Sequence, residues 1–321
     1  MGQALRRALV ITALVVSTGY VLQIGDVPAR PARTTPGPVA ISTSLLTRAD
    51  SSGREYFVKH HEVVPVGSTA IRLPILMYHY VRKPPSMVYD LLGYRLSVSP
   101  EVFQSQMDWL AANGYHSVNF NQVRAYFAGT APLPPRPVVI TLDDGYNDLY
   151  TAAFPILKAH SFTAVAYIVP NFVGTPAYVS RNEIVEMDRY GIEIASHTMN
   201  HADLARMSYG SVMYELVQSK KWLEALVGHP VVDFAYPSGK FNSQVVSEVQ
   251  QAGYDTAVTE QVSIMHSRAD RYTWARVRVG GGEGLADFIG GLGPSMSSVT
   301  ITSVNVASPE PQPGKQSSPG A

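Results

Sequence analysis

The 321-residue sequence contains no cysteine, and this absence excludes several kinds of site. Without thiols the chain cannot form disulfides, ligate an iron–sulfur cluster or a Cys-type zinc finger, or use a cysteine nucleophile. Charge is also scarce, because Asp, Glu, Lys and Arg make up 16% of the residues and sum to a net charge of zero. Nucleic-acid binders usually carry a basic field, so we expect no nucleic-acid partner. The 45% of hydrophobic residues are enough for one large core.

An uncharged, largely apolar run lies near the beginning of the sequence. Arg6 and Arg7 precede residues 8–24, which contain no charged side chain. This pattern is typical of a secretory signal peptide or an uncleaved signal anchor, although the run is short for a span of about 20 residues. We therefore expect residues 1–27 to export the chain, so that it is secreted or works in the cell envelope. In this interpretation the chain meets a membrane only through this segment, if it is not cleaved.

Composition divides the rest of the chain into three parts. Residues 28–70 are rich in Pro, Arg, Thr and Ser and indicate a linker or stalk. Residues 294–321 have the same character and indicate a disordered tail. Residues 71–293 remain as one folded domain, which we expect to be a monomer.

Strand and helix patterns alternate along this domain. The apolar strand segments are residues 73–78, 137–141, 163–169, 192–196, 233–236, 254–258 and 276–279, and helical spacing is found at residues 99–113, 149–159, 182–189, 208–227, 244–252 and 285–292. Alternation of this kind predicts a parallel sheet, and continuous apolar strands predict a sheet buried on both faces. We expect an α/β fold, a distorted (β/α) barrel with about seven parallel strands, with an open doubly wound sheet as the alternative. No strand-to-helix turn carries a glycine-rich phosphate motif.

Polar residues able to do chemistry follow the ends of these strands. His79 follows one strand, Asp143 and Asp144 another, His197 a third, and Tyr236 ends a fourth. In β/α barrels the active site lies at the carboxyl ends of the strands. As an alternative, Asp143 and Asp144 could simply be residues of a turn. A turn alone does not explain why both acids directly follow an apolar strand.

Two histidines have the spacing of metal ligands. His197 and His201 form H-x3-H, so on a helical turn both imidazoles face the same side. Asp144 could add a carboxylate from the neighbouring strand. Two imidazoles and one carboxylate suit a single catalytic divalent metal ion, with Zn as the first choice and Co or Ni as alternatives. Asp143 would then remain free as a general base.

At these residues the chain resembles the polysaccharide deacetylases of the NodB-homology type, carbohydrate esterase family four. The segments TLDDGY at residues 141–146, SHTMNHADL at 196–204 and FAYPSG at 234–239 are similar to the family's first three motifs, in order. The segments PILMYHYV at 74–81, LSVSP at 96–100 and WARVR at 274–278 resemble the branch that includes the poly-N-acetylglucosamine deacetylases.

The resemblance implies a role for each matching residue. Asp143 is the base, and Asp144, His197 and His201 hold the metal. The backbone N–H of Tyr146 helps to hold the tetrahedral oxyanion. Because they lie in the motifs, we assign substrate binding to Tyr146, Tyr236, Pro237 and Gly239.

Three departures from the family pattern change individual assignments. The proline that usually follows the second histidine is Ala202 here. The third motif often has an arginine where Tyr236 stands, and that arginine orients the catalytic aspartate, so we assign this role to Arg276. The fifth motif, which supplies the general acid, has no convincing counterpart. We therefore assign the acid role to His79, with a structural histidine as the alternative.

The sequence thus predicts a metal-dependent hydrolase that removes N-acetyl groups from an N-acetylglucosamine-containing polysaccharide and releases acetate. Two alternatives stay open: a glycan-binding cell-wall protein that keeps the fold without turnover, and a hydrolase of small amides or imides. The sequence does not distinguish among peptidoglycan, poly-N-acetylglucosamine and chitin fragments as substrates.

Overall fold

The computed structural model describes residues 47–49, 55–57 and 70–293. Strand β1 (Thr47–Ala49) pairs antiparallel with β2 (Glu55–Phe57) in a unit separate from the main domain, and the composition of this stretch did not predict that pair. The predicted export segment and tail lie outside the described residues. Among the described helices, none combines the length and the apolar character that a membrane span requires.

A curled sheet of seven parallel strands forms the centre of the domain, as the sequence predicted. Its order is β12-β11-β10-β9-β8-β4-β14, and β7 (His116–Ser117) pairs with β8 outside this path. The strands are β4 (Ile75–Tyr78), β8 (Pro137–Leu142), β9 (Val165–Ile168), β10 (Glu193–Ser196), β11 (Asp233–Ala235), β12 (Thr256–Val258) and β14 (Val277–Arg278). Two short pairs accompany the sheet: β3 (Ala70–Arg72) with β13 (Met265–Ser267), and β5 (Tyr80–Val81) with β6 (Ser97–Val98).

The chain that leads into β14 joins the two edges of the curled sheet. Trp274 forms a parallel bridge with Val258 of β12, and its N–H donates to the Ala257 carbonyl at 3.0 Å. Two residues later the N–H of Arg276 donates to the Gln261 carbonyl at 2.7 Å. The next residues, in β14, pair with β4 at the other edge of the sheet. The result is a distorted (β/α) barrel with the Arg276 backbone in the closing segment.

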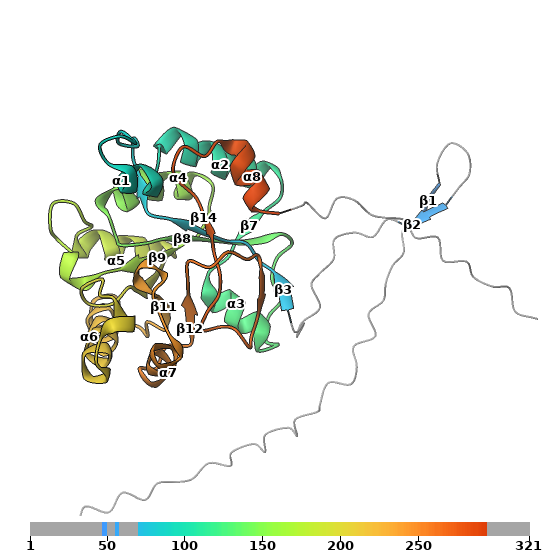
Figure 1. Cartoon of the computed structure of the whole chain (residues 1–321). Coiled ribbons are helices and arrows are strands. Elements are labelled where there is room, and N and C mark those ends of the chain that lie inside the picture. Colours follow the sequence, from blue (N-terminus) through green and yellow to red (C-terminus); the bar gives the residue numbers. More distant parts are fainter. Residues whose placement is uncertain (1–46, 50–54, 58–69, 294–321) are drawn as a thin grey trace, which may run out of the picture. The chain divides into compact units, whose positions relative to one another are not determined.

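Helices surround the strands (Figure 1). Helix α2 contacts α4 and α8 on one side of the sheet, and α6 contacts α5 and α7 in a second group. Their bounds are α1 (Leu91–Leu96), α2 (Pro100–Ala112), α3 (Phe120–Phe127), α4 (Phe154–Ala159), α5 (Arg181–Tyr190), α6 (Tyr209–Val227), α7 (Ser243–Gln251) and α8 (Leu285–Gly291). Local signals explain several ends: Ser99 caps α2, and Gly191 ends α5 in the left-handed region at φ 113°.

The predicted helices are present, and two further ones were missed. The predicted helix at residues 149–159 begins with a π-helical turn, Leu149–Ala153, and continues as α4. Pro155 accounts for the change, because it lacks the N–H that an α-helix needs at that position. Helices α1 and α3 are short, and the residues around them gave no clear apolar spacing. The start of α3 is nevertheless fixed locally, by a capping box between Asn119 and Gln122.

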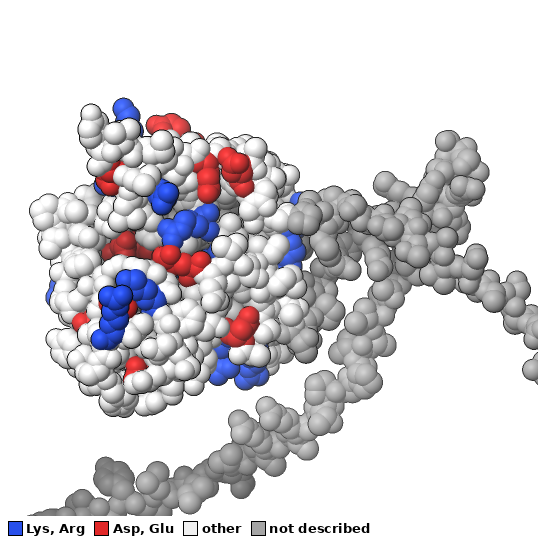
Figure 2. Space-filling view, viewed as in Figure 1, with Lys and Arg blue, Asp and Glu red and all other residues white. Residues whose placement is uncertain are grey.

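The alternation of side chains along each strand separates two cores. Val139 and Thr141 of β8 face the barrel interior with Val165 and Ala195, whereas Ile140 faces the outer helices. This parity carries Asp143 inward at the end of β8 and His197 inward at the end of β10. Buried strands therefore aim these polar side chains at the carboxyl end of the barrel. On the face seen in Figure 2, acidic and basic side chains lie close together near the middle of an otherwise largely uncharged surface.

Candidate active site

Strand β8 ends in two aspartates that point in different directions. The Asp143 N–H still belongs to the sheet, because it donates to the Tyr78 carbonyl at 2.9 Å. Asp144 then adopts φ 70°, in the left-handed region, and Gly145 follows at φ 75°. This reversal turns the second carboxylate away from the first. A residue other than glycine adopts the left-handed region at a cost in free energy. Such strained positions are typical of functional sites.

Arg276 forms a buried, two-pronged ion pair with Asp143. Its Nη1 and Nη2 lie 2.7 and 2.8 Å from Oδ1 and Oδ2 of the carboxylate, and both side chains are almost completely buried. Nη1 also donates to Oγ1 of Thr141 at 3.0 Å, and Nε donates to the Thr259 carbonyl at 2.9 Å. Burial by itself would raise the pKa of Asp143, but the charge and hydrogen bonds of Arg276 hold that pKa below its usual range. The carboxylate is therefore ionised at neutral pH.

His79 lies on the other side of the same carboxylate. Its Nε2 is 3.8 Å from Oδ2 of Asp143, and its buried Nδ1 has no hydrogen-bond partner among the described residues. Burial lowers the pKa of His79, and the negative charges of Asp143 and Asp144 only partly offset this effect. The neutral imidazole is therefore the favoured form near pH 7.

Asp144, His197 and His201 meet as a compact cluster. Nε2 of His197 and Nε2 of His201 lie 3.4 and 3.3 Å from Oδ1 of Asp144, and the candidate ligand atoms are all within 4.8 Å of one another. His201, like Asp144, has a left-handed backbone, at φ 56°. Burial by itself would raise the pKa of Asp144, but the neighbouring imidazoles lower it below its usual range.

The donor set of this cluster suits a divalent metal ion. Nδ1 of His197 lies 2.8 Å from the Ala235 carbonyl, which can only accept, so Nδ1 carries the proton and the lone pair of Nε2 faces the cluster. Oδ1 of Asp144 is buried and makes no hydrogen bond within the described residues. A buried carboxylate oxygen and two imidazole nitrogens that face one point form a ligand set typical of Zn, Co or Ni.

Glu215 on α6 holds the loop that carries His201, and the sequence interpretation missed it. Its Oε2 accepts the backbone N–H groups of Met199 and Asn200, both at 2.9 Å, and its Oε1 accepts from the Asn200 side chain at 2.6 Å. A signal for it exists in the sequence. Glu215 lies on the same face of α6 as the buried residues Val212 and Leu216. An acidic side chain is rarely buried unless it has a polar partner, so its position on this face indicates a structural or functional role.

Stacked aromatic rings line one side of the site. The ring of Tyr146 stacks on Tyr80, with centroids 3.7 Å apart, and on Tyr178, with centroids 5.0 Å apart. The Arg82 guanidinium lies 3.5 Å from the centroid of Tyr80. Tyr80 and Tyr146 lie within the sequence segments that resemble the family, at residues 74–81 and 141–146, whereas Tyr178 belongs to a loop with no pattern of its own.

The backbone N–H of Tyr146 is not used by the fold. Tyr146 and Tyr178 form an isolated antiparallel bridge whose hydrogen bonds run between the flanking residues, from Asn147 N to Ala177 O and from Val179 N to Gly145 O. In such a pair the N–H of the central residue points away from the partner strand. Within the described residues it donates to no protein group.

The side chain of Tyr236 lies elsewhere than the substrate-binding assignment requires. It is fully buried, packs on Phe241 and Phe234, and donates its hydroxyl to the Tyr272 carbonyl at 3.0 Å. The reason is strand parity: Ala235 faces the barrel interior, so Tyr236 faces the outer helices with Phe234. The ring therefore supports the loop and is not available to a sugar.

The other two residues of this motif shape the loop after β11. Pro237 is buried, and Gly239 adopts φ 62° with its N–H donating to the Tyr236 carbonyl at 2.9 Å. A Cβ atom at Gly239 would lie 2.8 Å from Cβ of Glu260, so no larger residue fits without movement. The structure gives both residues a backbone role.

Fold and site together define a class: a distorted (β/α) barrel with an Asp–His–His cluster beside an arginine-held aspartate at the carboxyl ends of its strands. Residues 130–257 match the family model described as polysaccharide deacetylase. The chain therefore carries a polysaccharide deacetylase domain over these residues.

Curated relatives agree with this assignment. The chain is 28% identical over 211 residues to YxkH of Bacillus subtilis (strain 168), provisionally named as a polysaccharide deacetylase, covering 66% of this chain and 72% of that protein. It is 30% identical over 207 residues to the poly-beta-1,6-N-acetyl-D-glucosamine N-deacetylase of Escherichia coli (strain K12). That match covers 51% of this chain but only 31% of the Escherichia coli protein.

Solved structures share the fold. The Streptococcus pyogenes deacetylase PplD, determined in complex with acetate, is 25% identical and superimposes with a TM-score of 0.65, covering 70% of this chain and 100% of that chain. A Bacillus cereus polysaccharide deacetylase is 26% identical with a TM-score of 0.62, covering 77% of this chain and 75% of that chain.

Proposed function

We propose that this protein is a metal-dependent N-deacetylase that hydrolyses N-acetyl groups of an N-acetylglucosamine-containing polysaccharide. The observation that carries the proposal is the placement of two groups side by side. One is Asp143, held by Arg276, and the other is the cluster of Asp144, His197 and His201.

Asp143 is suited to act as the general base. Arg276 keeps its carboxylate ionised and fixes its plane, so it can accept the proton of a water that attacks the acetyl carbonyl carbon. A low pKa makes it a weak base by itself. A divalent metal ion held by the three cluster residues, with Zn as our first choice and Co or Ni next, would supply the missing drive by acidifying the water and polarising the carbonyl.

The chain also offers a donor for the oxyanion. The Tyr146 N–H has no acceptor within the described residues and follows Asp144 by two positions, so we assign it to the developing negative charge on the acetyl oxygen. A preorganised backbone donor of this kind stabilises the tetrahedral state more than the planar amide. This supports the role that the resemblance implied.

His79 is our general acid. Its Nε2 is 3.8 Å from Oδ2 of Asp143, so the proton taken from water would reach the imidazole through one bridging water or after the two groups approach in the substrate complex. The protonated ring would then donate that proton to the sugar nitrogen as the C–N bond breaks, and acetate would leave with the oxygen of the water. The low pKa of His79 makes its protonated form a strong acid.

Two observations support a sugar polymer as the substrate. Tyr146 and Tyr178 present stacked, partly exposed rings beside the cluster, and such rings suit the apolar faces of sugars. Relatives from Escherichia coli and Staphylococcus aureus are named as poly-beta-1,6-N-acetyl-D-glucosamine N-deacetylases. We therefore place this glycan first, before peptidoglycan and chitin oligomers.

The test is acetate release from each of these three glycans by protein reconstituted with Zn, Co or Ni. We expect release from at least one glycan, loss of release on chelation, and loss in Asp143→Asn. Release that survives Asp143→Asn would disprove the mechanism. Glycan binding without acetate release under any metal would instead favour the inactive binding protein, and hydrolysis of small amides alone would favour the third alternative.

We also propose that the chain acts as a monomer outside the cytoplasm. The support for export is the pair Arg6 and Arg7 followed by the uncharged residues 8–24. Fusing residues 1–70 to a phosphatase that is active only after export should give activity, and replacing both arginines with glutamate should abolish it. An inactive fusion with the native residues would contradict export, and sedimentation of the purified protein tests the monomer.

A further inference from the structure

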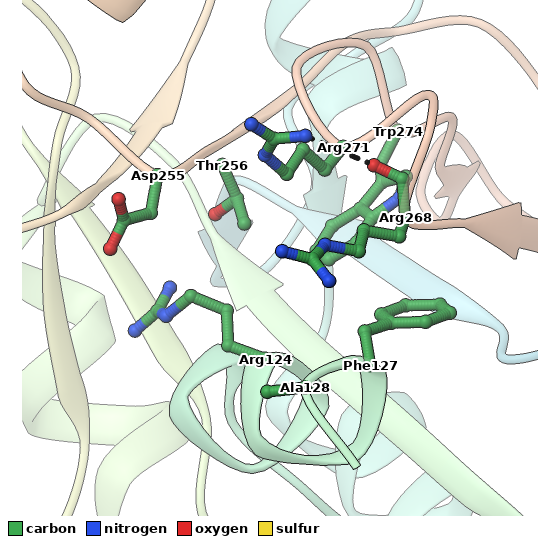
Figure 3. A pocket seen from close by; sticks show the side chains of 8 residues that line it. All are labelled: Arg124, Phe127, Ala128, Asp255, Thr256, Arg268, Arg271 and Trp274. Atoms are coloured by element: carbon green, nitrogen blue, oxygen red, sulfur yellow. Dashed lines mark hydrogen bonds between the residues drawn. The ribbon is translucent and has the colours of Figure 1, made fainter. Parts of the chain in front are cut away.

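A second hollow lies at the opposite end of the strands from the candidate active site. It has a volume of about 250 Å³ and lies between α3 and the turn that follows β13. In Figure 3, α3 forms one wall, and the segment that carries Arg268, Arg271 and Trp274 forms the other. Thr256, the first residue of β12, also lines it. The hollow therefore opens at the amino ends of the strands, where neither Asp143 nor the Asp–His–His cluster contributes.

One of the three arginines in the hollow is already neutralised. Arg124 of α3 forms ion pairs with Asp233 and, at 3.3 Å, with Glu193, at the starts of β11 and β10. It also donates to the Asn121 side chain at 2.6 Å. Arg124 is thus part of the frame that joins α3 to the sheet.

The other two arginines have no carboxylate partner among the described residues. Arg271 donates to the Arg268 carbonyl at 3.3 Å, and its guanidinium lies 4.5 Å from the centroid of the Tyr272 ring. The exposed guanidinium of Arg268 makes no ion pair within the described part of the chain. Asp270 lies between them in sequence, but its Oδ1 accepts from the N–H and hydroxyl of Ser267 and so holds the turn. Asp255, at the opposite side of the hollow, is the carboxylate that lines it.

Aromatic rings form the apolar part of the hollow. Trp274 is buried and its indole N–H is already donated to the Ser267 carbonyl at 2.9 Å, so it forms the floor of the hollow and offers no donor. Phe127 lies beside it, with ring centroids 6.0 Å apart. An apolar ring surface next to unpaired guanidinium groups suits a sugar ring that bears a carboxylate or a phosphate.

We propose that this hollow binds an acidic sugar unit, with Arg268 and Arg271 pairing its anionic group and the half-buried ring of Phe127, next to the buried Trp274, contacting its ring. The volume of about 250 Å³ accommodates one sugar unit. The site is separate from the hydrolysis proposed above, because its residues lie at the other end of the barrel. It would let the protein bind an anionic glycan at a place other than the active site.

The test is an NMR titration of the full chain that follows the indole N–H signals of its three tryptophans. The probes are glucuronic acid, glucose 6-phosphate, uncharged glucose and inorganic phosphate. We expect either acidic sugar, or both, to shift the Trp274 signal while Trp109 and Trp222 stay fixed, and we expect glucose to have no effect. The double variant Arg268→Ala with Arg271→Ala should weaken binding at least tenfold, since charge-assisted hydrogen bonds are lost. Arg189→Ala, an exposed arginine of α5, is the matched control and should bind as the native chain does.

Several outcomes would overturn the proposal. These are no shift with either acidic sugar, an equal shift with glucose, equal affinity for inorganic phosphate without the sugar, and unchanged affinity in the double variant. The single variant Arg268→Glu is a second test in case the double variant misfolds, because the exposed Arg268 side chain does not contribute to the core. Reversing its charge alone should abolish binding. Acetate release from an uncharged oligomer should be the same in all of these variants, which separates this site from the active site.

Discussion

Both carboxylate oxygens of Asp143 are held by the two terminal nitrogens of Arg276, at 2.7 and 2.8 Å, in a pair that solvent does not reach. The two residues are 133 positions apart in the sequence. The pair therefore depends on barrel closure, which brings the segment before β14 to the end of β8. Its geometry fixes the direction in which the base can accept a proton.

The first prediction concerns the charge and shape of this pair. Arg276→Lys keeps one positive charge but loses the fork, so the pKa of Asp143 should rise. The carboxylate would then be protonated at a higher pH, and the acid limb of the rate profile should move upward. Because a single ammonium group no longer fixes the plane of the carboxylate, the base is misaligned, and we expect acetate release to fall about 100-fold at neutral pH with metal content unchanged. The measurement is the pH profile of kcat/KM for both proteins.

Two controls accompany this measurement. Arg189→Lys changes an exposed arginine and should leave the profile as it is. Arg276→Ala is unsuitable because an unpaired buried carboxylate costs about 3–5 kcal/mol and can unfold the domain. A folded Arg276→Lys protein with the native pH profile would show that Arg276 does not determine the pKa of the general base Asp143.

The second prediction concerns Glu215, which touches none of the candidate ligands. Glu215→Gln removes the negative charge and one of the two acceptors, so the amide cannot accept from both the backbone N–H groups of Met199 and Asn200 and the Asn200 side chain, and the loop should loosen. Because these residues precede His201, metal affinity should fall about 10- to 100-fold. Metal retained after dialysis against graded chelator concentrations gives the affinity. His197→Ala should lose the metal entirely, Glu186→Gln on α5 should keep it, and native affinity in Glu215→Gln would refute the anchoring role.

The third prediction separates His79 from the metal site. His79→Gln should lower kcat about 100-fold or more while metal content stays native, because general acid catalysis typically contributes at least that factor. Substrates whose amine leaves more easily should lose less activity. A structural histidine would instead reduce stability, with equal losses for good and poor leaving groups. Turnover at the native rate in His79→Gln would remove the residue from the mechanism.

The fourth prediction is a pH dependence of stability at Asp148. Burial raises the pKa of this carboxyl from 3.8 to about 6, and its Oδ1 has no hydrogen-bond partner within the described residues. The protonated form is favoured in the fold, so stability is complete below pH 4 and declines as pH rises through 6. Asp148→Asn cannot ionise and should not decline. Above pH 6 we expect the free energy of unfolding of the variant to exceed that of the native chain by about 3 kcal/mol.

Chemical denaturation at a series of pH values measures this difference. The two proteins should coincide near pH 4, which serves as the internal control, and diverge between pH 4 and pH 6. A gap that is the same at every pH would mean that the substitution acts through packing and not through the charge.

Local patterns in the sequence were enough for the elements and for the metal-ligand candidates. The predicted strands and helices match the structure to within about two residues, because continuous apolar runs and helix caps act over short distances. The H-x3-H spacing of His197 and His201 survives as a cluster with Asp144, since parallel strands bring their carboxyl ends to one edge.

Other parts of the site depend on contacts that no local pattern records. Tyr236 looked available for a sugar, yet the parity of β11 turns it toward the outer helices. Tyr178 and Glu215 join the site from a loop and a helix, through pairings with distant residues.

The sequence by itself determined which residue types are available: a chain without thiols, a set of buried strands, and aspartates and histidines placed directly after them. Tertiary structure alone decided which of these side chains meet. Barrel closure, strand parity and the reversed backbone at Asp144 set those directions, and each depends on long-range packing. The residue types therefore determine which chemical groups are available, and the fold determines which of these groups lie close enough to act together.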